Sequence, residues 1–181
     1  MLYQFKYTLS EKDYMEFNKY HLLNAPSNKR GIIVLRLLLP LIFLVYLLFS
    51  FFLFEEHSSL LIEFIIFAVI SVIWFFIVKP LLIFNLKLRI KMIKKDGKLP
   101  YGKDVLVQFD EDSFIETIHE AESKANYKII EKIAVGKNAA YIYINAMQAV
   151  IVPFSVFETN EQKNEFLAFI NKKRETAREI K

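Results

Sequence analysis

Histidine, serine and acidic side chains would carry any acid–base, nucleophilic or metal chemistry in this chain. The three histidines, His21, His57 and His119, are far apart, and no pair has the spacing of metal ligands on a helix. Gly97 and Gly102 belong to no phosphate-binding motif, and no serine lies in a GxSxG turn. We therefore expect no catalytic residue, no cofactor and no metal, and interpret the histidines as surface or packing residues.

Acidic residues offer one further possibility. Residues 110–112 (DED) could bind a cation, but a short polar run between two apolar segments is typical of a turn between strands, which we favour. Glu116, Glu120 and Glu122 are expected to form a solvated face. The chain has no cysteine, which excludes disulfides, thiolate catalysis and Cys-ligated zinc.

A basic stretch is the best candidate for a contact with function. The net charge of +4 is unevenly spread, because residues 79–103 hold eight Lys or Arg and one acid. Basic clusters just cytoplasmic of a membrane span attract anionic phospholipid headgroups, although the same residues could only set the orientation. No nucleic-acid-binding motif surrounds them, so nucleic acid is not an expected partner. The predicted lipid-facing basic patch consists of Lys87, Arg89, Lys91, Lys94 and Lys95.

Two long apolar runs organise the chain around a membrane. Residues 32–54 and 60–78 number 23 and 19, and a spanning helix needs about 20 mostly apolar residues. Only five residues, 55–59, connect them, so residues 31–79 are predicted to form an antiparallel transmembrane hairpin. The connection holds two acids and no Lys or Arg, whereas the other ends are basic. We expect a multi-pass protein of the cell membrane with both termini cytoplasmic.

Two ionisable residues lie inside these runs, each about one turn from an end. Arg36 and Glu63 are expected to reach the membrane interface with their polar heads. The alternative is that they line a path, in which case the hairpin would oligomerise and move an ion or small solute.

The flanking segments have different patterns. Residues 1–30 predict a half-buried strand at 3–8 and a helix that begins after Ser10, and we expect both to pack on the C-terminal domain. Residues 80–98 permit two interpretations, because residues 84–92 alternate like a strand while the apolar residues also form a helical stripe. We favour a basic juxtamembrane helix, since the preceding span already nucleates it.

The C-terminal domain, residues 99–181, is predicted to be rich in β-structure. A polar loop is expected at residues 120–126, and Thr159 with Gln162 predicts a capped final helix. The fold class is α+β: a two-helix transmembrane hairpin and a small antiparallel sheet domain with a C-terminal helix, a pleckstrin-homology-like layout. The predicted strands, forming an antiparallel meander, are residues 105–109, 114–119, 127–135, 140–144 and 148–152.

The chain also resembles the YcxB-like family of small bacterial membrane proteins. The resemblance is carried by the twin spans and by residues 7–14 (YTLSEKDY), 109–114 (FDEDSF), 141–144 (YIYI) and 149–157 (AVIVPFSVF). It implies a C-terminal pleckstrin-homology-like domain and brings no activity and no catalytic residues. One departure is Phe154, which follows the proline where the family often has a basic residue; this weakens any ligand contact at that position.

These observations favour a non-enzymatic integral membrane protein that presents a cytoplasmic binding module. Its expected partners are anionic phospholipid headgroups and an unknown protein or peptide, or a second copy of the chain. Strand addition to an exposed sheet edge is one mode of binding. The oligomeric ion or solute component is the alternative function.

Overall fold

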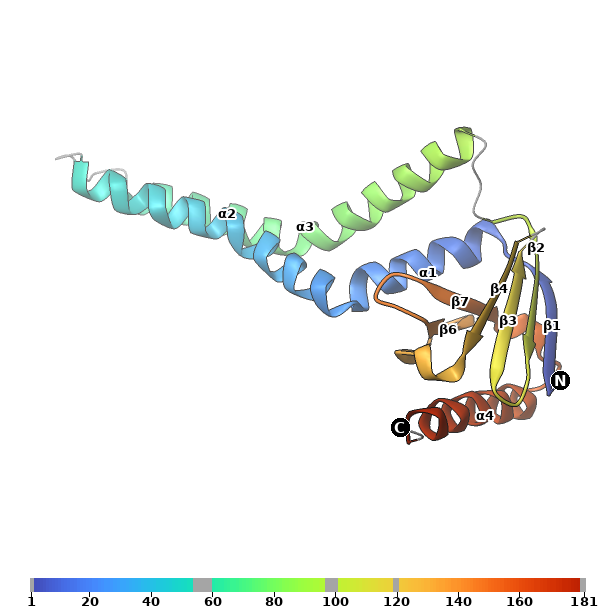
Figure 1. The fold of residues 1–181 in the computed structure, drawn as a ribbon. Helices are drawn as coiled ribbons and strands as arrows, with labels where there is room; N and C mark the ends of the chain where they lie inside the picture. Colours follow the sequence, from blue (N-terminus) through green and yellow to red (C-terminus); the bar gives the residue numbers. More distant parts are fainter. Residues whose placement is uncertain (1, 54–59, 97–100, 119–120, 180–181) are drawn as a thin grey trace. The chain divides into compact units, whose positions relative to one another are not determined.

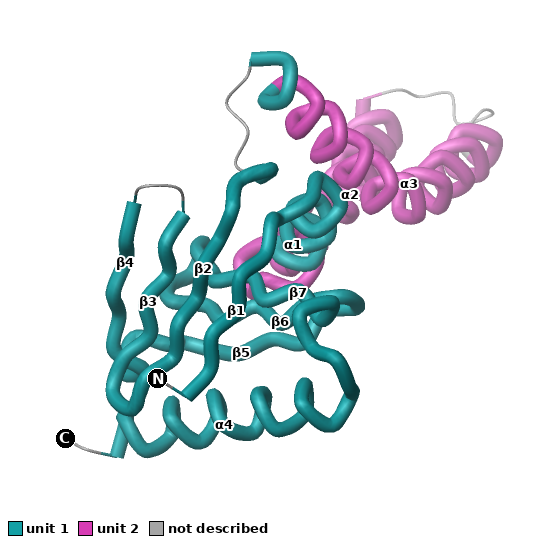
Figure 2. The backbone as a smooth tube through the Cα atoms, turned by 90° about the vertical axis from the view of Figure 1, so that its right-hand side faces the viewer, with its two compact units in different colours: residues 1–21, 93–181 teal, residues 22–92 magenta. Residues whose placement is uncertain are grey.

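In the computed structural model, residues 2–53, 60–96, 101–118 and 121–179 are described. The chain divides into two compact units, coloured separately in Figure 2. The sheet unit comprises Met1–His21 and Ile93–Lys181, and the hairpin unit comprises Leu22–Met92. The fold is α+β, as the sequence predicts, with two long apolar helices, two antiparallel sheets and a C-terminal helix (Figure 1).

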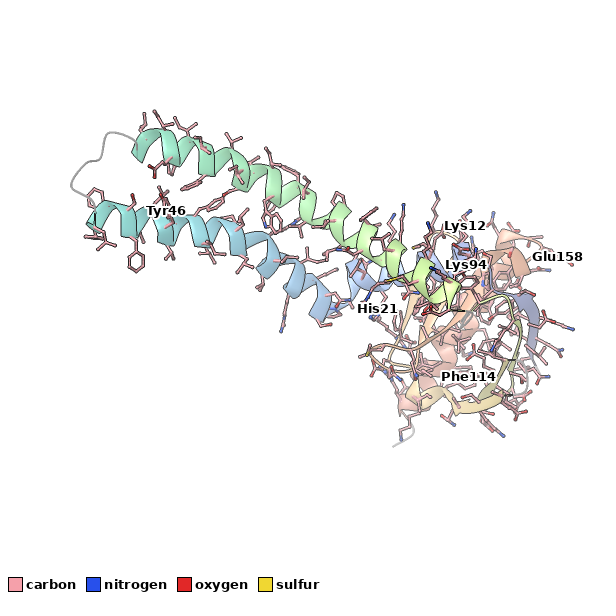
Figure 3. The ribbon with its side chains drawn as sticks, turned by 90° about the horizontal axis from the view of Figure 1, so that it is seen from above. Lys12, His21, Tyr46, Lys94, Phe114 and Glu158 are labelled. Carbon is pink, nitrogen blue, oxygen red and sulfur yellow. The ribbon has the colours of Figure 1, made fainter. Side chains whose placement is uncertain are left out.

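The hairpin unit contains α2 (Pro26–Leu53) and most of α3 (Leu60–Lys95). Both helices are long and apolar enough to cross a membrane, and only 6% of the most apolar window of each is buried. Their apolar side chains project outward along both helices (Figure 3). At 1.5 Å per residue, the 36 residues of α3 extend about 54 Å, well beyond the hydrocarbon thickness of a bilayer. The helix predicted for residues 81–95 is therefore confirmed as a continuation of the second apolar run.

Specific contacts hold α2 and α3 together. The rings of Phe43 and Phe67 stack with centroids 4.5 Å apart, and Tyr46 meets Phe67 edge-on at 5.3 Å. The indole N–H of Trp74 donates to the carbonyl oxygen of Leu35 at 2.9 Å, which satisfies a polar group inside an apolar helix pair. The predicted connection at residues 55–59 lies outside the described residues.

Two sheets form the sheet unit, with strand orders β1-β2-β3-β4 and β5-β6-β7, all neighbours antiparallel. The first strand precedes the hairpin unit in sequence and pairs with the strand that follows it, Tyr3 opposite Phe109 and Thr8 opposite Asp104. The strands are β1 (Tyr3–Thr8), β2 (Asp104–Phe109), β3 (Ser113–Ile118), β4 (Ala121–Asn126), β5 (Lys132–Val135), β6 (Ala139–Tyr143) and β7 (Ala149–Pro153).

Two predictions for the sheet unit were wrong. Residues 120–126, predicted as a loop, contain β4, an edge strand that is almost wholly exposed and therefore carries no apolar alternation. Residues 127–135, predicted as one strand, begin with a 3₁₀ turn, η1 (Tyr127–Ile129), before β5. Asn126 causes this turn, because its side-chain oxygen accepts from the backbone N–H of Lys128 at 2.8 Å. The single predicted meander is therefore two sheets.

Helices lie at the two ends of the sheet unit. In the view of Figure 1, α4 (Asn160–Glu179) lies below the sheets and α1 (Glu11–Asn24) above them. Ser10 and Asp13 form a capping box at the start of α1, with the Asp13 N–H donating to the Ser10 hydroxyl and the Ser10 N–H to the Asp13 carboxylate. At α4, the N–H of Gln162 donates to the hydroxyl of Thr159 at 3.2 Å, as predicted. The turn η2 (Phe154–Val156) precedes that helix.

Aromatic residues fill the core between the first sheet and α4. Phe166 of α4 is fully buried, and its ring lies 5.1 Å from the rings of both Phe5 and Phe109, and 5.4 Å from Tyr3. Phe5 and Phe109 come from strands separated by the hairpin unit, so Phe166 packs against both of them from a third segment. The core therefore depends on contacts between distant parts of the chain.

We expect Phe166→Ala to destabilise the sheet unit by about 3–5 kcal/mol, because it removes a buried ring and leaves a cavity. Hydrogen exchange of β2 and β3 amides in the full-length protein in detergent measures this loss of protection. Glu165→Ala, at an exposed position next to it on α4, is the matched control, with an expected change within about 0.5 kcal/mol. Equal protection in both variants would contradict the assigned core.

Candidate functional site

The basic patch predicted from the sequence lies on α3, and all five of its side chains are exposed. Helical periodicity places Lys87, Lys91, Lys94 and Lys95 on one side, whereas Arg89 lies roughly half a turn away from Lys87. Lys94 also forms an exposed ion pair with Glu11, with Nζ 2.6 Å from Oε2. That carboxylate raises the pKa of Lys94 and keeps it charged. Three lysines therefore share a face without an ion pair among the described residues.

Arg36 and Glu63, the ionisable residues inside the two apolar runs, are partly buried in the hairpin unit. The guanidinium of Arg36 lies 4.3 Å from the ring centroid of Phe75 on the other helix. Such a cation–π contact stabilises a charge that leaves water. Glu63 is half-buried on α3. The contact of Arg36 with Phe75 is a packing contact within one hairpin.

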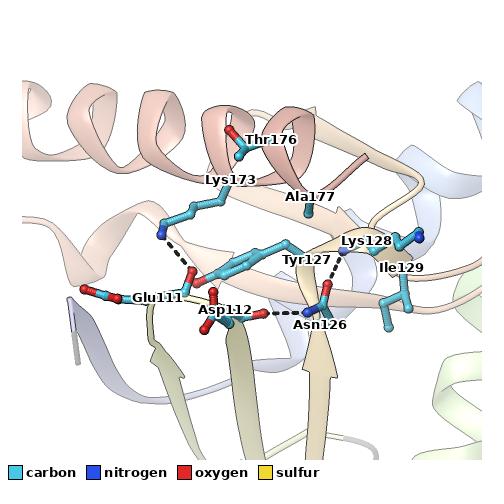
Figure 4. Close-up of a pocket in the computed structure, with 9 residues that line it drawn as sticks. All are labelled: Glu111, Asp112, Asn126, Tyr127, Lys128, Ile129, Lys173, Thr176 and Ala177. Atoms are coloured by element: carbon cyan, nitrogen blue, oxygen red, sulfur yellow. Dashed lines mark hydrogen bonds between the residues drawn. The ribbon is translucent and has the colours of Figure 1, made fainter. Parts of the chain in front are cut away.

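The acidic run at residues 110–112 forms a turn that borders a pocket of about 470 Å³ beside α4 (Figure 4). Its backbone carbonyl oxygens are used in hydrogen bonds. The Lys173 ammonium donates to the Glu111 carbonyl at 2.7 Å, and the Tyr127 hydroxyl donates to that of Asp110 at 2.7 Å. Burial, with smaller contributions from the neighbouring carboxylates, raises the pKa of Tyr127. No group of acidic or histidine residues suited to a metal ion occurs in the described residues.

Of the three histidines, only His21 lies within the described residues. Its ring stacks on that of Tyr143 with centroids 6.0 Å apart and lies 6.2 Å from Phe17. Burial and the positive charge of Lys132 lower the pKa of His21, so the ring is neutral near pH 7. This position is one of packing, as the sequence suggested.

The feature that sequence analysis missed is Glu116 on β3. Glu116 pairs with Val107 of β2, whose side chain is fully buried, and paired residues of an antiparallel sheet share one face. Phe114, two residues earlier in the same strand, is also buried. Glu116 therefore points inward from the first sheet and is only partly exposed. The prediction that it belongs to a solvated face was wrong, whereas Glu122 on β4 is exposed as predicted.

An apolar pocket surrounds this carboxyl group. The Glu116 pocket has a volume of about 360 Å³ and lies at the α1 end of the sheet unit, with walls from α1, both sheets and the loop before β7. Ser123 and Met147 line it and are exposed, so they mark its mouth. Its lining residues are Leu9, Tyr14, Phe17, Glu116, Ile118, Ser123, Ile144, Met147, Gln148, Ala149 and Ile151.

Burial is the cause of the shifted pKa of the Glu116 carboxyl group. Loss of solvation raises the pKa of its carboxyl group from 4.5 to about 7, and no ion pair or hydrogen bond to it occurs in the described part of the chain. Glu116 in turn contributes to a raised pKa of the neighbouring phenol of Tyr7, whose main cause is burial. The Tyr7 hydroxyl donates to the carbonyl oxygen of Ile151. Tyr7 is thus a neutral, satisfied group, and Glu116 is the group that titrates near neutral pH.

The sign of the resulting pH dependence follows from linkage. The folded-state pKa of Glu116 exceeds the unfolded value, so between pH 4.5 and 7 the folded state holds the proton that the unfolded state releases. Stability therefore falls as pH rises through this window, and the loss is roughly 3 kcal/mol above pH 7.

We expect Glu116→Gln to remove this loss. The variant gains stability relative to the natural chain as pH rises from 5 to 8, by roughly 3 kcal/mol. Hydrogen exchange of β2 and β3 amides, corrected for intrinsic rates, measures the difference. Glu122→Gln is the control, because this exposed side chain lies on the neighbouring strand. A constant difference between Glu116→Gln and the natural chain across this range would show that Glu116 is solvated.

One signal in the sequence could have located Glu116. In residues 113–118 the alternate positions are Phe114, Glu116 and Ile118, so a carboxyl group shares the face of two apolar residues. An acidic residue on an apolar strand face is therefore a candidate for a buried position, and a buried polar residue is an informative observation in a protein.

Comparison with known proteins identifies one family. The family model described as YcxB-like protein matches residues 109–170, which begin at the end of β2 and extend into α4. The match confirms the resemblance predicted from the sequence over this stretch. The chain matches no curated protein and no solved structure.

Proposed function

We propose that this chain, whose residues 109–170 are YcxB-like and whose α2 and α3 have membrane-spanning length, is a non-enzymatic integral membrane protein that carries a binding module. In this proposal the sheet unit binds a protein or peptide partner, and the basic patch binds anionic phospholipid headgroups.

One observation carries the proposal: β1 and β2 are hydrogen-bonded neighbours although two membrane-length helices separate them in sequence. Paired strands must lie on the same side of a membrane. An even number of crossings therefore separates them, which a two-helix hairpin satisfies. The sheet unit is thus connected to both ends of the hairpin. Two such connections would keep a binding module close to the membrane surface.

The layout of the sheet unit supports a binding role. In this proposal the four-stranded and three-stranded antiparallel sheets with their C-terminal helix form a pleckstrin-homology-like module, which their strand order and the resemblance of the sequence support. Such folds host many functions, so this likeness does not identify the ligand. An edge strand such as β4 presents unpaired backbone groups that a partner strand can use.

The distribution of charge supports a cytoplasmic location for the sheet unit. Residues 79–103 carry eight Lys or Arg and one acid, and short basic segments next to a span stay in the cytoplasm. Anionic lipids of the cytoplasmic leaflet attract such residues by about 1 kcal/mol per charge close to the surface. On α3 this attraction would act on Lys87, Lys91 and Lys95, which share one helix face.

We expect anionic lipid to protect these three lysines from chemical acetylation. In vesicles that contain phosphatidylglycerol, their rates fall about fivefold relative to pure phosphatidylcholine, as about 1 kcal/mol per charge requires. High salt restores the rates because it screens exposed charges. Lys124 and Lys137, exposed in the sheet unit, are the controls and should keep their rates. Protection that does not depend on lipid charge would contradict the lipid contact.

Crosslinking in living cells tests the binding module itself. The tagged full-length protein is crosslinked through its lysines, purified and analysed by mass spectrometry. The expected result is a stoichiometric protein that is joined to lysines of the sheet unit, such as Lys124 of β4 or Lys128 of η1. Crosslinks confined to the hairpin unit would contradict the proposal.

A further inference from the structure

We propose that the Glu116 pocket binds a small organic ammonium ion, with the alkyl part of the ligand against the apolar walls and its ammonium group at the Glu116 carboxylate. This ligand site is distinct from the basic patch and from the unpaired backbone edge of β4, which are the surfaces that the proposed function uses, although Ser123 of β4 lines the pocket. It also lies wholly within the sheet unit, so it does not depend on how the hairpin is placed.

The walls suit an apolar body. Phe17 of α1, Ile118 of β3 and Ile151 of β7 line the pocket together with Leu9 and Ile144. These residues come from segments far apart in sequence that converge on one space. The volume of about 360 Å³ lies at the lower end of the range for ligand pockets, so the ligand is small.

The carboxyl group requires a positive partner. A half-buried carboxylate without an ion pair is costly to keep ionised, and a cation that enters the pocket removes this cost. Among the described residues, Glu116 is the only acidic or basic side chain that lines the pocket, and it forms no ion pair with any of them. The electrostatic complement of this site is therefore a single positive charge.

An ammonium group fits better than a metal ion. Metal sites in proteins need several anionic or imidazole ligands, and the described residues contain no such group. An ammonium has three donors and can be satisfied by one carboxylate and neutral oxygens. Tyr14, Ser123 and Gln148 line the same pocket and carry such oxygens. An exposed Met147 at the mouth offers a flexible apolar side chain that can close over the ligand.

Binding is coupled to protonation of the pocket. Among the described residues, the titratable neighbours of Glu116 are the phenol of Tyr7 on β1, which interacts with its charge, and that of Tyr14 on α1, which lines the same pocket. Burial raises the pKa of Tyr7, so this phenol stays neutral. The pKa of Glu116 is about 7 in the empty pocket, so below that pH an ammonium must displace a proton. Affinity therefore rises with pH from 5 and levels off near pH 8, where the carboxyl group is almost fully ionised.

The test uses the full-length protein in lipid nanodiscs and three probes of equal carbon count: n-butylammonium, n-butanol and butyrate. Saturation-transfer NMR at pH 8 detects binding of each. Butylammonium is expected to bind ten- to a hundredfold more tightly than butanol, the range expected for a hydrogen bond to a charged group. Butyrate is not expected to bind. Equal binding of butylammonium and butanol would overturn the proposal.

Variants connect this preference to the carboxylate. Glu116→Gln should reduce butylammonium binding to the level of butanol and abolish its pH dependence, while Glu122→Gln leaves both unchanged. Unchanged butanol binding by Glu116→Gln shows that the pocket is still folded. If the variant instead retains tight butylammonium binding, the ammonium site lies elsewhere and the proposal fails.

A second comparison identifies the source of the ammonium group. Lysine blocked at both backbone ends presents the same alkylammonium on a peptide. If blocked lysine binds more tightly than butylammonium, the pocket takes a lysine side chain of a partner protein. If blocked lysine binds more weakly, the pocket takes a free amine. Because crosslinking tests the protein partner separately, failure of the ammonium site leaves the proposed binding module standing.

Discussion

The pairing of β1 with β2 is the constraint on which the rest of the structure depends. These strands are neighbours in the first sheet, yet the whole hairpin unit lies between them in sequence. Their pairing means that the sheet unit cannot form before both membrane helices have been synthesised. It also requires both ends of the hairpin to be on one side of the membrane. The pairing thus links the fold of the sheet unit to the topology of the membrane segment.

The interior of the sheet unit differs in polarity between the end near α4 and the end near α1. At the α4 end, aromatic rings from β1, β2 and α4 pack edge-to-face, and the inward-pointing residues named there are all apolar. At the α1 end, the same face of the first sheet places the carboxyl group of Glu116 in an apolar pocket. Native folds accept the cost of a half-buried acid where it serves a purpose, because an apolar residue of similar size would be more stable there. A ligand site at this end accounts for the cost.

The two candidate surfaces differ in physical character. The basic patch is exposed, charged and sensitive to salt, and it suits the diffuse negative charge of a membrane surface. The Glu116 pocket is open on one side, with mostly apolar walls and one carboxyl group, and it suits a small ligand that is recognised by both shape and charge. The two features therefore point to different binding events in the same protein.

The sequence by itself determined the elements that depend on local pattern: the two apolar runs, the helix at residues 81–95, the capped helix after Thr159 and the resemblance later confirmed over residues 109–170. Apolar content and helix capping depend on residues that are close together in the sequence, so these elements can be predicted without a tertiary structure. Only the tertiary structure decided β4, the turn η1 and the direction of Glu116. An exposed edge strand has no apolar alternation, so its sequence does not predict a strand. Residues 113–118 place Glu116 on the same face as Phe114 and Ile118, but only the register opposite Val107 shows that this face points inward.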